Sequence, residues 1–125
     1  MSNAITVTVI LKNSTSNPPK IKLKDSEGHD PGNDDITTTV DAGDTVTWIP
    51  DIASGIASLA GIRKKNVSGN NDLLAGNASP SGANYVGTIK SPSPGKNKVE
   101  KYEIGFKITG SDQTHWDDPK LKMKA

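Results

Sequence analysis

The stretch Val40-Asp41-Ala42-Gly43-Asp44-Thr45-Val46-Thr47-Trp48 decides the fold. Residues 41–44 form a tight turn, because Gly and Asp adopt turn conformations more easily than other residues do. Apolar and polar residues then alternate from 45 to 49, as they do in a strand with one buried face. Residues 36–40 alternate in the same way before the turn. The stretch therefore predicts two strands that form a hairpin.

The same period-two alternation recurs along the whole chain. Segments rich in Gly, Pro, Ser and Asn separate the alternating runs, and such segments are typical of loops. We expect strands at 5–11, 20–24, 36–40, 45–49, 57–65, 85–90, 99–109 and 120–124. About eight short strands with turns between them predict an all-β protein, a Greek-key sandwich or barrel of 7–8 strands. At 125 residues, the chain has the length of one domain, residues 1–125.

Residues 50–65 fit two patterns. Ile52, Ile56 and Leu59 have helical spacing, whereas alternate residues from 56 to 62 fit a strand. Two glycines, at positions 55 and 61, count against a helix interior, where each costs about 1 kcal/mol relative to Ala. The sequence therefore favours a short turn followed by a strand over 57–65.

The turn at 41–44 and the strand that ends on Trp48 resemble elements of the cupredoxin fold. The long strand around Tyr102 and Phe106 and the short last strand fit the same order of elements. A second resemblance is to the bacterial inclusion-body protein family, which also has a Gly-Asp turn before a Trp-bearing strand and a Trp-Asp-Pro-like stretch near its end. That stretch is 116–119 here, with an additional Asp. Both resemblances imply a β-sandwich.

The cupredoxin resemblance does not extend to copper. A blue-copper site takes two histidines, a cysteine thiolate and a weak axial ligand such as methionine. The chain contains no cysteine, and His115 is the only histidine in the region where the thiolate and second histidine would lie. Met123 alternates with lysines and is expected in the core. We therefore predict a copper-free scaffold with no metal and no cofactor.

Charge and motifs exclude several classes of function. The net charge is +1, from 15 basic and 14 acidic residues, so no strong field attracts nucleic acid or a membrane. The chain has no nucleophile elbow, phosphate-binding loop or zinc-protease motif. Residues 26–30 place Ser26, His29 and Asp30 on one polar loop, but catalytic triads are assembled from separated segments. The sequence therefore predicts a protein that is not an enzyme.

Four residues are the candidate binding residues: Tyr85, His115, Trp116 and Asp117. They combine aromatic and hydrogen-bonding groups, as a small-ligand or carbohydrate site does. Two alternative metal sites also remain open. His115, Asp117 and Asp118 offer ligands for a divalent ion, and the loop at 30–35 has the oxygen ligands that calcium prefers, without the spacing of an EF-hand.

The loops at 50–55, 66–84 and 110–118 are predicted to lie at one end of the sandwich and to form an interaction surface. Long loops often carry function. We therefore expect a binding or structural module that contacts protein partners or copies of itself, with a small ligand as the alternative. No signal peptide or membrane span is recognisable, which favours a cytoplasmic protein. The lysines at 20, 22 and 24 and at 120, 122 and 124 either protect strand edges or, as neighbours, form a basic ridge.

Overall fold

The computed structural model describes residues 3–13, 15 and 19–125. Within these residues the chain forms ten strands and one turn of 3₁₀ helix, η1 (Ile52–Ser54). The strands are β1 (Ala4–Asn13), β2 (Lys20–Asp25), β3 (Thr37–Val40), β4 (Thr45–Pro50), β5 (Ile56–Lys64), β6 (Ser79–Ser81), β7 (Asn84–Thr88), β8 (Val99–Ile108), β9 (His115–Asp117) and β10 (Lys120–Met123).

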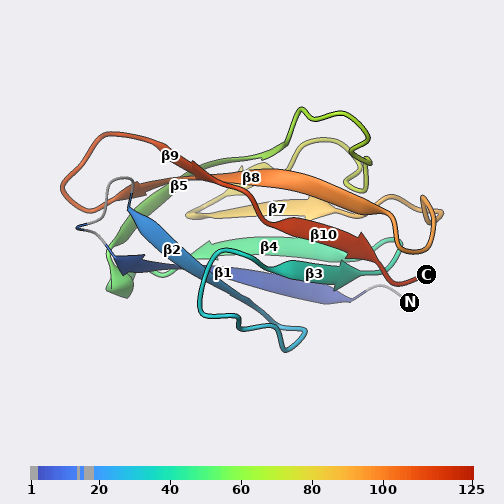
Figure 1. Ribbon diagram of the computed structural model, residues 1–125, viewed down its shortest axis with the longest axis horizontal. Helices are drawn as coiled ribbons and strands as arrows, with labels where there is room; N and C mark the ends of the chain where they lie inside the picture. The colour runs from blue at the N-terminus through green and yellow to red at the C-terminus, as the bar shows by residue number, and fades with distance from the viewer. Residues whose placement is uncertain (1–2, 14, 16–18) are drawn as a thin grey trace.

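The strands form two mixed sheets packed face to face (Figure 1). The first sheet has the order β2-β1-β4-β7-β6, and the second has the order β3-β10-β8-β5, with β9 continuing the line of β10 along β8. This confirms the predicted all-β sandwich. The two strands beyond the expected eight, β6 and β9, are three residues long and lie in segments that were predicted as loops.

The turn at 41–44 joins the two sheets, so the predicted hairpin is wrong. β3 pairs in parallel with β10, whereas β4 pairs with β1 and β7 in the other sheet. The buried Asp44 holds the turn, because its carboxylate accepts the backbone N–H groups of Asp41 and Asn3, each at 2.8 Å. Turn residues reverse the chain equally well within a sheet and between sheets. The alternation around the turn therefore identified both strands but not their partners.

The core lies between the sheets, and Trp48 and Tyr102 occupy its centre. Both side chains are fully buried, and the indole Nε1–H of Trp48 donates to the Tyr102 hydroxyl at 3.0 Å. Their rings meet edge to face, with centroids 5.5 Å apart, a favourable arrangement for two aromatic rings. Met123 is also fully buried. The predicted core positions of Trp48 and Met123 are thus confirmed.

Strand β5 explains the two patterns at 50–65. Its register with β8 shifts twice, between Ile56 and Ser58 and between Leu59 and Gly61, as it does at β-bulges. Each shift adds one residue, so the buried side chains of β5 recur every third residue, at 56, 59 and 62. The spacing of three between apolar residues, which also fits a helix, is therefore that of a bulged strand. The predicted short turn and strand are confirmed.

Candidate functional site

A groove of about 530 Å³ lies between β9, the start of β2 and residues 33–34. It brings together three of the four predicted binding residues, His115, Trp116 and Asp117, with Ile21 and Phe106 as apolar lining residues. Tyr85 is not among the residues that line it. Tyr85 belongs to β7 in the first sheet, where it is partly buried and packs against the core.

The chemistry of the groove centres on the carboxyl group of Asp117. Burial and a hydrogen bond with Asp34 raise the pKa of Asp117 to about 8. The negative charges of Asp34 and Asp118 act in the same direction. Asp34 precedes β3, whereas Asp117 ends β9, so the two carboxyl groups join distant parts of the chain. Near neutral pH the carboxyl group of Asp117 therefore holds a proton, which removes one negative charge from the groove.

Asp34, Asp117 and Asp118 form a cluster whose oxygen atoms lie within 4.8 Å of one another. Such oxygens suit a hard divalent cation. However, Lys65 Nζ lies 2.5 Å from Asp118 Oδ2, and the proton on Asp117 competes with a metal. The cluster takes Asp117 and Asp118 from one predicted metal site and Asp34 from the other, and it leaves His115 out. The pairing of Asp34 with Asp117 could not be predicted because 83 residues separate them in the sequence.

Trp116 has both faces of its ring covered. It is aligned with Gly105 of β8, and Gly105 is aligned with Gly61 of β5, so three cross-strand neighbours lie in one row. The indole lies over both glycines, because a Cβ atom on Gly105 would be 2.8 Å from its ring atoms and one on Gly61 would be 3.3 Å away. Arg63 stacks on the ring, with its guanidinium carbon 3.6 Å from the centroid. A sugar therefore cannot stack on Trp116 unless Arg63 moves.

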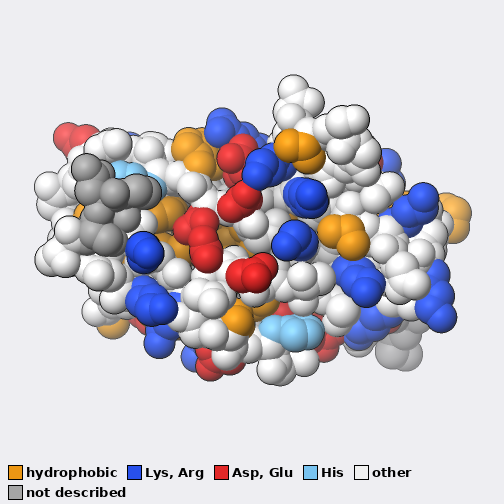
Figure 2. All heavy atoms as spheres, in the orientation of Figure 1, with side chains coloured by type: hydrophobic (Ala, Val, Ile, Leu, Met, Phe, Trp, Pro, Cys, Tyr) orange, Lys and Arg blue, Asp and Glu red, His pale blue; other side chains and the backbone are white. Residues whose placement is uncertain are grey.

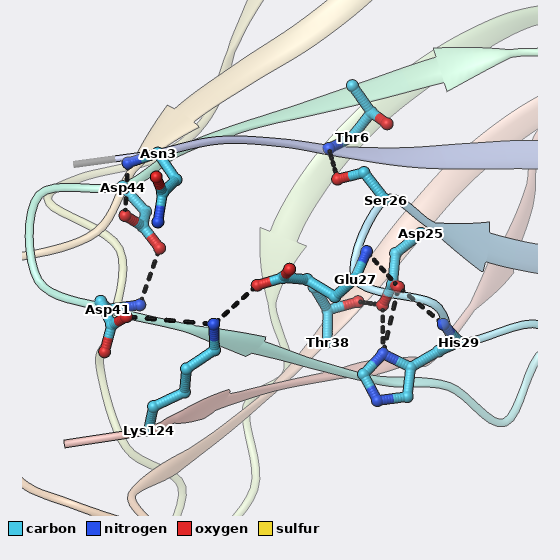
Figure 3. Close-up of polar contacts among 10 residues, drawn as sticks. All are labelled: Asn3, Thr6, Asp25, Ser26, Glu27, His29, Thr38, Asp41, Asp44 and Lys124. Carbon is cyan, nitrogen blue, oxygen red and sulfur yellow. Dashed lines mark hydrogen bonds and ion pairs between the residues drawn. The ribbon is translucent and has the colours of Figure 1, made fainter.

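Ser26 and His29, two of the three polar residues at 26–30, form part of a structural seam between the sheets together with Asp25 (Figure 3). Ser26 accepts the backbone N–H of Thr6 at 3.0 Å, whereas His29 Nδ1 lies 2.9 Å from a carboxylate oxygen of Asp25. The buried Asp25 side chain also accepts the hydroxyl of Thr38, on the other sheet, at 2.8 Å. These contacts hold β2 against β3 and do not form a triad.

The three loops predicted at one end of the sandwich do not lie together. The N–H of Thr109 donates to Gly55, so residues 50–55 lie beside the end of β8. By contrast, Asn71 bonds to Val99 at the start of the same strand, which is ten residues long. The prediction of one common surface is therefore wrong, because residues 66–74 lie at the other end of β8.

The segment 66–78 also belongs partly to the core. Leu73 and Leu74 are buried, and their N–H groups donate to one carboxylate oxygen of the buried Glu100, at 2.7 and 3.1 Å. Burial raises the pKa of Glu100, while these two hydrogen bonds lower it. Two adjacent leucines in a polar segment were the signal in the sequence for this anchor.

The lysines do not form one basic ridge. Lys20, Lys22 and Lys24 lie on β2, whereas Lys120 and Lys122 lie on β10 in the other sheet. Lys120 lies 3.6 Å from Asp35, and Lys124 lies 2.8 Å from Glu27. Figure 2 shows acidic and basic side chains interspersed on the face in view. Acidic neighbours therefore offset the charges of Lys120 and Lys124.

Among the described residues, five strands have a neighbouring strand on one side only, and four of them, β2, β3, β6 and the three-residue β9, are short or covered. On β2, Leu23 and Asp25 donate their N–H groups to residues 33 and 29 of the following loop. Strand β3 has four residues, and β6 has three residues with Pro80 in the middle. Short strands, prolines and covering loops all prevent sheets from joining at their edges. Strand β5, with nine residues, is the longest edge.

No protein-family model matches the sequence, and no curated protein matches it either. The structure, however, aligns with the crystal structure of an inclusion body protein (PixA) from Burkholderia cenocepacia J2315. The fold is shared with that protein. The alignment covers 98% of this chain and 92% of the other, with a TM-score of 0.55 and 12% sequence identity.

The match supports the resemblance to inclusion-body proteins at the level of the fold. The cupredoxin-like part of the prediction stays a prediction. Among the described residues, no helix is long and apolar enough to cross a membrane.

Proposed function

We propose that this chain is a non-enzymatic structural module that associates with copies of itself. The observation that carries the proposal is the β5 edge, which is long and has no covering segment among the described residues. Support comes from the shared fold with a protein described as an inclusion body protein. The scaffold is copper-free and cupredoxin-like in this proposal, and its contacts come from a strand edge in place of end loops.

The polar groups inside the protein also support a structural role. Asp25, Asp44 and Glu100 have buried side chains, and each accepts backbone or hydroxyl hydrogens that hold segments together. Ser26 and His29 are used in the same way, in contacts with Thr6 and Asp25. These groups stabilise the fold.

Native mass spectrometry, with light scattering over a series of protein concentrations, tests self-association. We expect masses of more than one copy, with a fraction that rises with concentration. A strict monomer up to the highest concentration reached would contradict the proposed function.

Binding of a small polar ligand is the second candidate function. The groove supports this second candidate, because the volume of the groove lies within the range of about 300–1,000 Å³ typical of ligand sites. A ligand there would contact His115, Asp117 and the edge of the Trp116 ring. Titration of sugars with tryptophan fluorescence detects such binding. The absence of a response, or an equal response in Trp116→Ala, would exclude this site.

A further inference from the structure

The backbone of β5 has an unpaired edge. The strand pairs with β8 along one side, from Ile56 to Lys64. Among the residues that the structure describes, the backbone bonds outside the strand ladders include none from 57–63. The N–H and C=O groups on the outer side of this segment therefore lack a backbone partner among the described residues, and another strand could supply one.

The side chains of β5 permit the close approach of a second strand. Ala57, Ser58 and Ala60 are exposed, while Ile56, Leu59 and Ile62 point into the core. The segment from 56 to 62 contains no charged residue. Charged residues are the usual protection of an exposed edge, and here they begin only at Arg63.

The large apolar side chains exposed among the described residues all lie around β5. They are Ile52, Val67 and Trp116, which are 55%, 38% and 38% exposed. Ile52 lies just before the strand, Val67 lies just after it, and the Trp116 ring covers Gly61 within it. An edge with apolar groups at both ends and at its middle is typical of a protein interface.

We infer that two copies of this chain pair through β5, with the strands antiparallel about a two-fold axis near Ala60. This inference rests on the proposed function and names its surface. Antiparallel pairing places Arg63 and Lys64 of each copy opposite the uncharged start of the other strand, whereas parallel pairing aligns like charges. It also brings Ile52 of one copy toward Val67 of the other.

Two-fold pairing of this kind closes at two copies, because each chain uses its single long edge. A larger assembly therefore needs a second contact elsewhere on the molecule.

The test places a charge at the centre of the interface with Ala60→Lys. The two new ammonium groups would face each other across the two-fold axis and repel. The matched control is Ala83→Lys, which changes an exposed alanine in the turn between β6 and β7. The dissociation constant of each variant is measured by analytical ultracentrifugation, with circular dichroism as a check of folding.

We expect Ala60→Lys to weaken the dimer roughly tenfold or more and Ala83→Lys to leave it unchanged. Mixing the Ala60→Lys chain with an Ala60→Asp chain should restore pairing, since opposite charges then meet. If the original chain self-associates and folded Ala60→Lys associates equally well, the β5 interface is wrong while the proposed function stands. If the original chain is monomeric, the proposed function itself fails.

Discussion

At the scale of single residues, a few side chains cover nearby backbone or accept its N–H groups. Trp116 covers two glycines that would otherwise expose their backbone, and Arg63 covers the other face of its ring. One carboxylate oxygen of Glu100 accepts the N–H groups of Leu73 and Leu74, which have no backbone acceptor among the described residues. The residue types at these positions were visible in the sequence. Their partners were not, because 40 or more residues separate Trp116 from Arg63 and Gly61.

Gly105→Ala should destabilise the protein by about 1–3 kcal/mol, as side chains forced into full sites do. The new methyl group would lie 2.8 Å from the Trp116 ring and displace it. Urea denaturation measures the free energy of unfolding. The same change in a Trp116→Ala background should cost much less, and equal costs in both backgrounds would contradict the contact.

Glu100→Ala should destabilise the protein by about 1–3 kcal/mol or more, because two buried N–H groups lose their acceptor. Glu100→Gln retains one carbonyl oxygen and should cost less. Hydrogen exchange at Leu73 and Leu74 reports the loss directly. Unchanged exchange in Glu100→Ala would show that the carboxylate does not hold this segment.

At the scale of elements, the sequence predicted most strands but not their neighbours. Alternation identified the faces of β1, β2, β4, β8 and β10, because a buried face has period two. It failed to identify β6 and β9, which are too short to show a period. It also placed β3 and β4 in one hairpin, since pairing depends on contacts with distant strands.

Tyr102→Phe tests the link between the sheets. Trp48 belongs to β4 and Tyr102 to β8, so their hydrogen bond joins the two layers inside the core. Without the hydroxyl, the buried indole N–H has no acceptor, and we expect a loss of about 1–3 kcal/mol in thermal or urea unfolding. Tyr85→Phe, on a partly buried tyrosine, is the control. Equal stability of both variants would argue against the link.

At the scale of the whole molecule, polar contacts join the layers around one apolar core. The carboxyl pair of Asp34 and Asp117 lies at the groove, and Asp25 and Thr38 lie at the seam. The sequence predicted that His115, Trp116 and Asp117 would lie together, since they are consecutive. It could not predict the groove, which is formed by residues from five parts of the chain.

Stability should depend on pH through Asp117. Its pKa is about 8 in the folded protein and 3.8 in its ordinary state, so the folded chain binds more protons between these values. The free energy of unfolding therefore falls as pH rises from about 4 to about 8. Melting temperatures across this range should show the decrease. Asp117→Asn should flatten it, and an unchanged slope in that variant would assign the dependence to another group.

The turn at 41–44 contacts both ends of the described chain. Asn3 donates to Asp44, and Lys124 donates its backbone N–H to Val40 and lies 3.9 Å from Asp41. Figure 1 shows the N- and C-terminal ends on the same side of the sandwich. The two ends of the described chain therefore lie near each other, and a short linker could join them. New ends could then be opened at the exposed Gly82, giving a circular permutant with the same strand order in space.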